Sequence, residues 1–115
     1  MMATSTSTEG ATPMGINVQV RTERGEVREQ LVDPHNVIAH LIHKAYAAQF
    51  PYLRHVDSYG NTYFNNAQLE EVVPELRHLS ELADTEEESA ALEEVERLAL
   101  ICRNAVHLYL VFAGD

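Results

Sequence analysis

The chain has 115 residues and a net charge of −10, from 18 acidic and 8 basic side chains. This length fits one domain with a real core, and 45% apolar residues is normal for a soluble globular protein. The charge argues against direct nucleic-acid binding, which relies on Lys and Arg contacts to phosphates, and favours a basic partner.

The composition along the chain also argues against a disulfide-bonded, a secreted or a membrane-spanning protein. Cys102 is the only cysteine, so no intramolecular disulfide and no cysteine-rich metal site can form. The start lacks a basic segment followed by an apolar one, so we expect no secretory signal. The longest apolar stretch, residues 98–113, contains Arg103, Asn104 and His107 and is not expected to span a membrane. We therefore expect a cytoplasmic protein.

The first residues differ in composition from the rest. Residues 1–14 are a low-complexity Ser/Thr-rich stretch with almost nothing to bury, so we expect a disordered tail. One domain is then expected to span residues 15–115.

A β-hairpin is predicted at the start of this domain. Apolar residues at every second position predict a strand at about 16–22. Residues 24–25, Arg-Gly, predict a tight turn because Gly accepts a positive φ, and a second strand follows at about 26–32. The opposing residues are expected to be Val18 with Leu31, Val20 with Glu29, and Thr22 with Val27.

The first helix is predicted to start at Asp33 and Pro34, with Asp as the N-cap and Pro at the first helical position. It should end near Gln49, before the next proline. Its apolar stripe is expected to contain Ile38, Leu41, Ile42 and Ala45. His40 and His43 lie opposite this stripe, which predicts exposed side chains rather than a metal site.

A block rich in Tyr and Asn follows at residues 52–66 and holds three of the five tyrosines. We expect two short extended arms about a turn at 58–61, where Gly60 supplies the turn. Aromatic and polar side chains on such a turn are typical of a contact surface. The candidate binding residues are Arg54, His55, Asp57, Tyr59, Asn61 and Tyr63.

Two more helices and a last strand complete the predicted fold. Capping boxes are expected at Asn65 with Gln68 and at Thr85 with Glu88. The apolar spacing continues through Pro74, which favours a kink over an end of the helix, and the next helix should reach about Arg103. A short connection makes these two helices an antiparallel hairpin, and β-forming residues predict a strand at 107–112. The expected fold is α+β, a small antiparallel sheet packed by three helices.

An enzymatic interpretation depends on His55 and Asp57. If residues 53–57 are extended, the two side chains share a face, and the carboxylate can orient the imidazole. This pair, with His107 as a further member, makes a small hydrolase or a metal-dependent enzyme the competing hypothesis. The alternative is that both residues hold the turn. No nucleophile motif is present, so we assign no catalytic residue, no metal and no cofactor.

The predicted helical hairpin is strongly acidic. Between residues 70 and 96 there are eleven acids and one base, Arg77. A solvated outer face explains this pattern, and so does a docking surface for a basic protein or a mimic of nucleic-acid charge. The candidate docking residues are Glu70, Glu71, Glu75, Glu81, Glu86, Glu87, Glu88 and Glu93.

Residues 52–115 also carry a recognisable pattern. It consists of Leu53-Arg54-His55-Val56-Asp57-x-Tyr59-Gly60-x-Thr62-x-Phe64-Asn65 and, after the helical hairpin, His107-x-Tyr109-Leu110-x-Phe112-x-Gly114-Asp115. This pattern resembles a group of small bacterial proteins of unknown function. The resemblance implies that the tyrosine-rich block and the last strand form one unit, paired in one sheet, and it implies no activity.

We therefore expect a small acidic bacterial protein-binding module. In size and acidity the chain is similar to immunity and antitoxin-like proteins, which suggests an inhibitor of a basic partner. The alternatives are the enzyme built on His55 and Asp57 and a nucleic-acid-mimicking inhibitor. No membrane contact is expected, and a homo-oligomer is compatible with the sequence.

Overall fold

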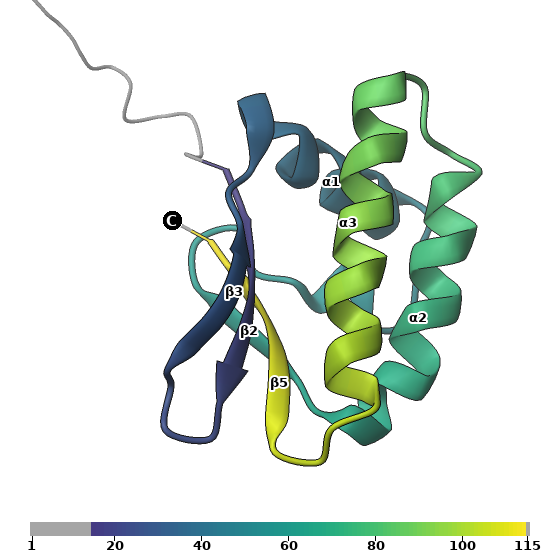
Figure 1. Cartoon of the computed structure of the whole chain (residues 1–115). Coiled ribbons are helices and arrows are strands. Elements are labelled where there is room, and N and C mark those ends of the chain that lie inside the picture. The colour runs from purple at the N-terminus through teal and green to yellow at the C-terminus, as the bar shows by residue number, and fades with distance from the viewer. Residues whose placement is uncertain (1–14, 115) are drawn as a thin grey trace, which may run out of the picture.

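The computed structural model describes residues 15–114, so the predicted tail at 1–14 lies outside the described residues. One layer is a four-stranded sheet, and the helices pack on one side of it (Figure 1). The elements are β2 (Asn17–Thr22), β3 (Val27–Leu31), a short 3-10 turn (Pro34–Asn36), α1 (Val37–Ala47), a second 3-10 turn (Leu53–His55), β4 (Asn61–Phe64), α2 (Asn66–Ser80), α3 (Glu86–Arg103) and β5 (Leu108–Ala113). The predicted α+β class is confirmed.

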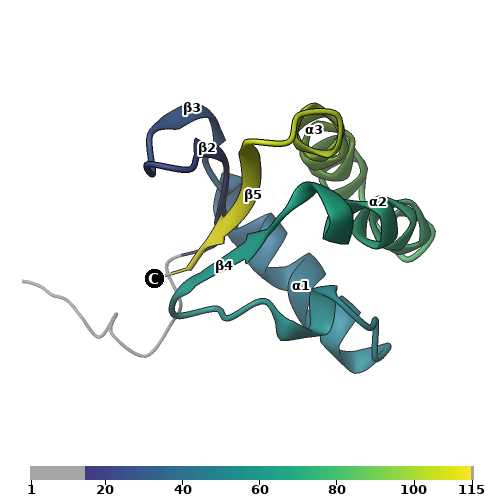
Figure 2. The ribbon, with the colours of Figure 1, turned by 90° about the horizontal axis from the view of Figure 1, so that it is seen from below.

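The strand order in the sheet is β3-β2-β5-β4, and every neighbouring pair is antiparallel. Figure 2 shows α1, α2 and α3 on the same face of this sheet, so its other face is not covered by a helix. The strand of the tyrosine-rich block, β4, pairs with the last strand, β5. The expectation that these two segments lie in one sheet is therefore confirmed.

The core lies between the helices and the covered face of the sheet. Alternate residues of the central strands point into it, and Phe64 of β4 packs edge-on against Phe112 of β5 with ring centroids 5.9 Å apart. The apolar stripes of all three helices close the core from the other side. Burial of this apolar surface is the main force that holds the two layers together.

The predicted hairpin forms, with one error in its register. Val18 pairs with Leu31 and Val20 with Glu29, as predicted, but Val27 pairs with Arg21 rather than with Thr22. Thr22 is used in the turn instead, because its N–H donates to the carbonyl of Glu26 at 2.9 Å. Between the pairs Val20–Glu29 and Arg21–Val27, β3 therefore has one residue more than β2. This extra residue forms a β-bulge.

The start of α1 differs from the prediction. Pro34 opens a 3-10 turn, and the α-helix begins only at Val37. Two consecutive residues, His35 (φ 57°) and Asn36 (φ 64°), adopt left-handed backbone conformations, which few non-glycine residues do. Asp33 nevertheless caps the helix across this turn. Its carboxylate accepts the N–H groups of Ile38 (2.8 Å), Ala39 (3.0 Å) and Ile16 (2.9 Å).

The end of α1 is a Schellman motif without glycine. The N–H of Phe50 donates to the carbonyl of Ala45, and the N–H of Gln49 donates to that of Tyr46, both at 3.0 Å. This geometry places Gln49 in the left-handed region, at φ 62°. Glycine is the usual residue here because it has no Cβ to clash with the following backbone.

We predict that Gln49→Gly stabilises the protein by up to about 1 kcal/mol, because it removes the cost of the left-handed conformation. Urea unfolding at neutral pH measures the effect. Gln49→Ala is the control, since it removes the same amide side chain and keeps the Cβ. If the glycine variant is no more stable than the alanine variant, backbone strain at this position is not significant.

The helical hairpin follows the prediction closely. Asn65 and Gln68 form the complete capping box of α2, and α2 runs through Pro74 without ending there. Thr85 caps α3 by accepting the N–H of Glu88 at 3.0 Å. The second capping box is incomplete, because the Glu88 carboxylate accepts the N–H of Asp84 instead.

Candidate functional site

The first arm of the tyrosine-rich block is not extended, which corrects the prediction for residues 53–57. Leu53–His55 form a 3-10 turn. The carboxylate of Glu75, on α2, accepts the N–H groups of Tyr52 (3.0 Å) and Leu53 (2.9 Å) and so holds the start of this turn. His55 and Asp57 consequently do not share the face of a strand.

The turn at 57–60 is held by local bonds. Asp57 accepts the N–H of Tyr59 at 2.8 Å, and its own N–H donates to the Thr62 hydroxyl at 2.9 Å. The carbonyl of Gly60 accepts the N–H of Gly114 at 2.7 Å, which ties the turn to the end of β5. Asp57 therefore has the structural role that the sequence left open, and it makes no hydrogen bond to an imidazole among the described residues.

The other two members of the enzymatic hypothesis lie elsewhere. The Nε2 atom of His55 is 3.4 Å from Nε of Arg54. The Nδ1 atom of His107 is 2.8 Å from a carboxylate oxygen of Glu23, beside the β2–β3 turn. The structure thus does not bring His107 to His55 and Asp57. In residues 15–114 no three His, Cys, Asp or Glu side chains gather in a way that could hold a metal ion.

Tyr63 belongs to a different surface from Arg54, the open face of the sheet. Its hydroxyl accepts a hydrogen bond from Arg21 at 2.9 Å, and its ring meets Tyr109 edge-on with centroids 6.5 Å apart. Val111, which pairs with Tyr63 across the strands, is completely buried beneath this layer. Tyr59, at the apex of the turn, is 68% exposed, and Asn61 is also exposed.

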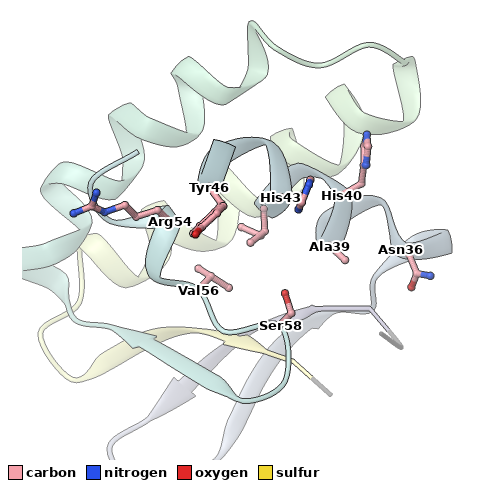
Figure 3. Close-up of a pocket in the computed structure, with 9 residues that line it drawn as sticks. Asn36, Ala39, His40, His43, Tyr46, Arg54, Val56 and Ser58 are labelled. Carbon is pink, nitrogen blue, oxygen red and sulfur yellow. The ribbon is translucent and has the colours of Figure 1, made fainter. Parts of the chain in front are cut away.

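A concavity runs between α1 and the segment at 54–58, and we call it the α1 groove (Figure 3). Its volume is about 390 Å³, which lies in the usual range for small-molecule pockets. The lining residues are Asn36, Ala39, His40, Ile42, His43, Tyr46, Arg54, Val56 and Ser58.

Of the predicted binding residues, only Arg54 lines the α1 groove. His40 and His43 are exposed, as the helical projection predicted, but they form part of the groove, which the sequence did not reveal. The missed signal is Tyr46, three residues after His43 and 59% exposed. An exposed tyrosine one helical turn from a histidine marks a helix face with contact chemistry.

The predicted acidic docking face divides into two groups. Glu75 and Glu88 are not free to dock a partner, because the Glu75 carboxylate accepts the N–H of Leu53 and the buried Glu88 carboxylate accepts that of Asp84. Of the remaining six, Glu87 lies beside His35 and Glu81 beside His78. Glu70, Glu71, Glu86 and Glu93 are exposed and form no ion pair within the part of the chain that the structure describes.

A polar cluster joins α1 to the α2–α3 connection. The Nζ atom of Lys44 donates to the Leu82 carbonyl (2.9 Å), Asp84 (2.7 Å) and Glu88 (3.1 Å). The hydrogen bond to Asp84 raises the pKa of Lys44. Lys44 in turn lowers the pKa of Asp84, and the pKa of Glu88 is lowered first by the Asp84 N–H and then by Lys44.

Cys102 lies on the buried stripe of α3, where desolvation raises the pKa of its thiol to about 12. A thiol with this pKa stays protonated at neutral pH, so it is a packing residue and not a nucleophile. Among residues 15–114, no helix combines the length and the hydrophobicity needed to cross a membrane.

Comparisons with known proteins assign neither a family nor a function to this chain. No protein-family model, curated protein or solved structure matches this chain. The resemblance of residues 52–115 to small bacterial proteins of unknown function therefore stays a prediction.

Proposed function

We propose that this chain is a non-enzymatic protein-binding module whose acidic helical hairpin receives a basic partner, as immunity and antitoxin-like inhibitors do. The observation that carries this proposal is an acidic hollow of about 430 Å³ at the start of α3. Its lining residues are Ala83, Asp84, Thr85, Glu86, Ser89, Ala90 and Glu93. The lining thus contains three carboxylates, two hydroxyl groups and no basic side chain.

The chemistry of the acidic hollow suits a Lys or Arg side chain of a partner. Asp84 is already bonded to Lys44, whereas Glu86 and Glu93 have no ion-pair partner among residues 15–114. The positive end of the α3 dipole offsets part of the charge of Glu86, within the first turn. Glu93 lies two turns further along α3, where this effect has faded, so its carboxylate is the stronger attraction for a cation.

The turn at 57–60 does not form one continuous interface with the acidic hollow. The turn at 57–60 lies beside the end of β5, whereas α2 and α3 form the opposite side of the molecule (Figure 1). We therefore assign the binding of the basic partner to the hairpin alone. The acidic charge of the hairpin accelerates the encounter, an effect that salt screens.

The test is a selection of binding peptides from a displayed random library, followed by affinity measurement on the selected peptides. We expect the selected peptides to be basic. The double variant Glu86→Gln/Glu93→Gln should lower their affinity by on the order of tenfold, as the loss of two partly exposed ion pairs predicts. The matched control is Glu70→Gln/Glu71→Gln, which makes the same charge change at the other end of the hairpin.

Two results would contradict the proposal. Selection of peptides without basic residues would show that the carboxylates of the acidic hollow do not attract the partner. An equal loss of affinity in the two double variants would show that net charge matters and that the acidic hollow does not.

A further inference from the structure

The α1 groove has an unusual charge for this protein. The chain carries 18 acids, yet none of the nine residues that line the groove is acidic. Apart from the Tyr46 phenol, its ionisable side chains are all bases, namely His40, His43 and Arg54. His40 lies 3.6 Å from a carboxylate oxygen of Glu88, so the complementarity to a negatively charged group rests on His43 and Arg54. The lining is unsuited to the cation that the acidic hollow attracts.

The rest of the lining is largely apolar. Ala39 and Ile42 line the groove from α1 and Val56 lines it from the opposite wall. The Ser58 hydroxyl points from that wall toward α1 (Figure 3). The stem of Arg54 covers one end, with its guanidinium turned outward. Few polar groups on an apolar surface are what a small organic ligand requires, because the apolar area supplies affinity and the polar groups fix orientation.

The walls of the groove are held in place without a ligand. The guanidinium of Arg54 donates to the Gln49 amide oxygen at 3.0 Å, and Gln49 itself is fixed by the end of α1. The opposite wall is anchored by the bonds of Asp57 and by the bond between Gly60 and Gly114. The backbone of both walls is therefore preformed, and the Arg54 side chain is the part that must move to meet a ligand.

Backbone strain lies at the other end of the groove. His35 and Asn36 adopt positive φ values in succession, and Asn36 lines the groove. Such conformations cost energy and are concentrated at ligand-binding sites. Asn36 lies at the end of the groove opposite Arg54 (Figure 3).

We propose that the α1 groove binds a small organic acid, with the apolar body on Ile42 and Val56 and the carboxylate at His43 and Ser58, where the Arg54 guanidinium reaches it by turning inward. Arg54 exchanges its bond to the neutral Gln49 amide for a charge-assisted bond to the carboxylate, which is the stronger of the two. This site is independent of the basic partner, because it lies on α1 and not on the acidic hollow.

The test is an NMR titration of the ¹⁵N-labelled chain with phenylacetate and hexanoate, and with phenylacetamide as the uncharged analogue. We expect saturable shifts of the backbone amides in 39–46 and 54–58 at millimolar acid. We expect the amide to bind on the order of tenfold more weakly, since it cannot form the charge-assisted bond. Arg54→Gln should lower the affinity for phenylacetate by a similar factor, and His43→Gln should also lower this affinity.

Arg24→Gln is the matched control, because it removes one exposed positive charge from the β2–β3 turn. The proposal is wrong if neither acid shifts these amides, or if phenylacetamide binds as tightly as phenylacetate. It is also wrong if Arg24→Gln weakens binding as much as Arg54→Gln, because net charge then explains the result. None of these outcomes bears on peptide binding at the acidic hollow.

Discussion

Asp33→Ala is expected to lower the free energy of unfolding by about 3 kcal/mol, the loss predicted when three backbone N–H groups lose a charged acceptor. The Asp33 carboxylate accepts the N–H groups of Ile38, Ala39 and Ile16, all within 3.0 Å. It thereby joins the start of α1 to the start of β2. No other side chain accepts a hydrogen bond from these three N–H groups among the described residues, so the alanine variant leaves them without a protein partner.

Urea unfolding at pH 7 measures this loss, and two variants control it. Asp33→Asn keeps one acceptor oxygen and should lose less stability than Asp33→Ala. Glu70→Ala removes an exposed carboxylate that forms no ion pair among residues 15–114, and it should stay within about 0.5 kcal/mol of wild type. A loss below about 1 kcal/mol in Asp33→Ala would be the effect of an ordinary helix cap, and would contradict the role assigned to the two oxygens.

Glu88→Ala is expected to destabilise the protein by about 2 kcal/mol, because it leaves the N–H of Asp84 without an acceptor and removes a partner of Lys44. Glu88 is buried, with 6% of its surface exposed. Lys44 keeps its bonds to Asp84 and to the Leu82 carbonyl, so the charge is not left isolated. This remaining contact is why the expected loss is smaller than for a broken buried ion pair.

The pH dependence of this effect follows from the pKa directions. The pKa values of Asp84 and Glu88 are lowered from their ordinary values of 3.8 and 4.5. Their contribution is therefore present above these values and is lost as the pH falls through the lowered pKa values. Lys44, with a pKa raised above 10.5, contributes fully below that value and loses its contribution as the pH rises past it.

Urea unfolding at about pH 7 and about pH 3 checks this linkage, since the contribution of a carboxylate with a lowered pKa decreases as the pH falls below its ordinary value. We expect the stability difference between wild type and Glu88→Ala to be smaller at the acidic pH. Glu88→Gln is the control, because it keeps an oxygen for the Asp84 N–H and removes the charge. A difference that does not change with pH would show that the lost stability is due to packing.

Local patterns correctly predicted the parts of the fold that neighbouring residues control. The capping box of Asn65 and Gln68 opens α2, and the alternation of Val18 and Val20 places β2 in the sheet. The apolar spacing also predicted correctly that α2 continues through Pro74. In each case the determining contacts lie within a few residues, or depend only on which face of an element is apolar.

The errors occurred where a distant side chain decides the local structure. Residues 53–57 have the composition of an extended arm, but Glu75 on α2 accepts the N–H groups of Tyr52 and Leu53 and holds a 3-10 turn. Glu88 looked like half of a capping box, but Lys44 and the Asp84 N–H hold its carboxylate. Glu75 and Glu88 of the predicted acidic face are therefore engaged in hydrogen bonds within the protein.

By itself, the sequence determined the fold class, the capping box of α2, the pairing of β2 with β3 and the acidity of the helical hairpin. These properties follow from periodicity, capping chemistry and composition, all of which are local. Only the tertiary structure decided that Arg54 and Tyr63 lie on different surfaces, and that His43, Ser58 and Arg54 line one groove. The physical reason is that hydrogen bonds and burial between segments far apart in the chain fix where each side chain points.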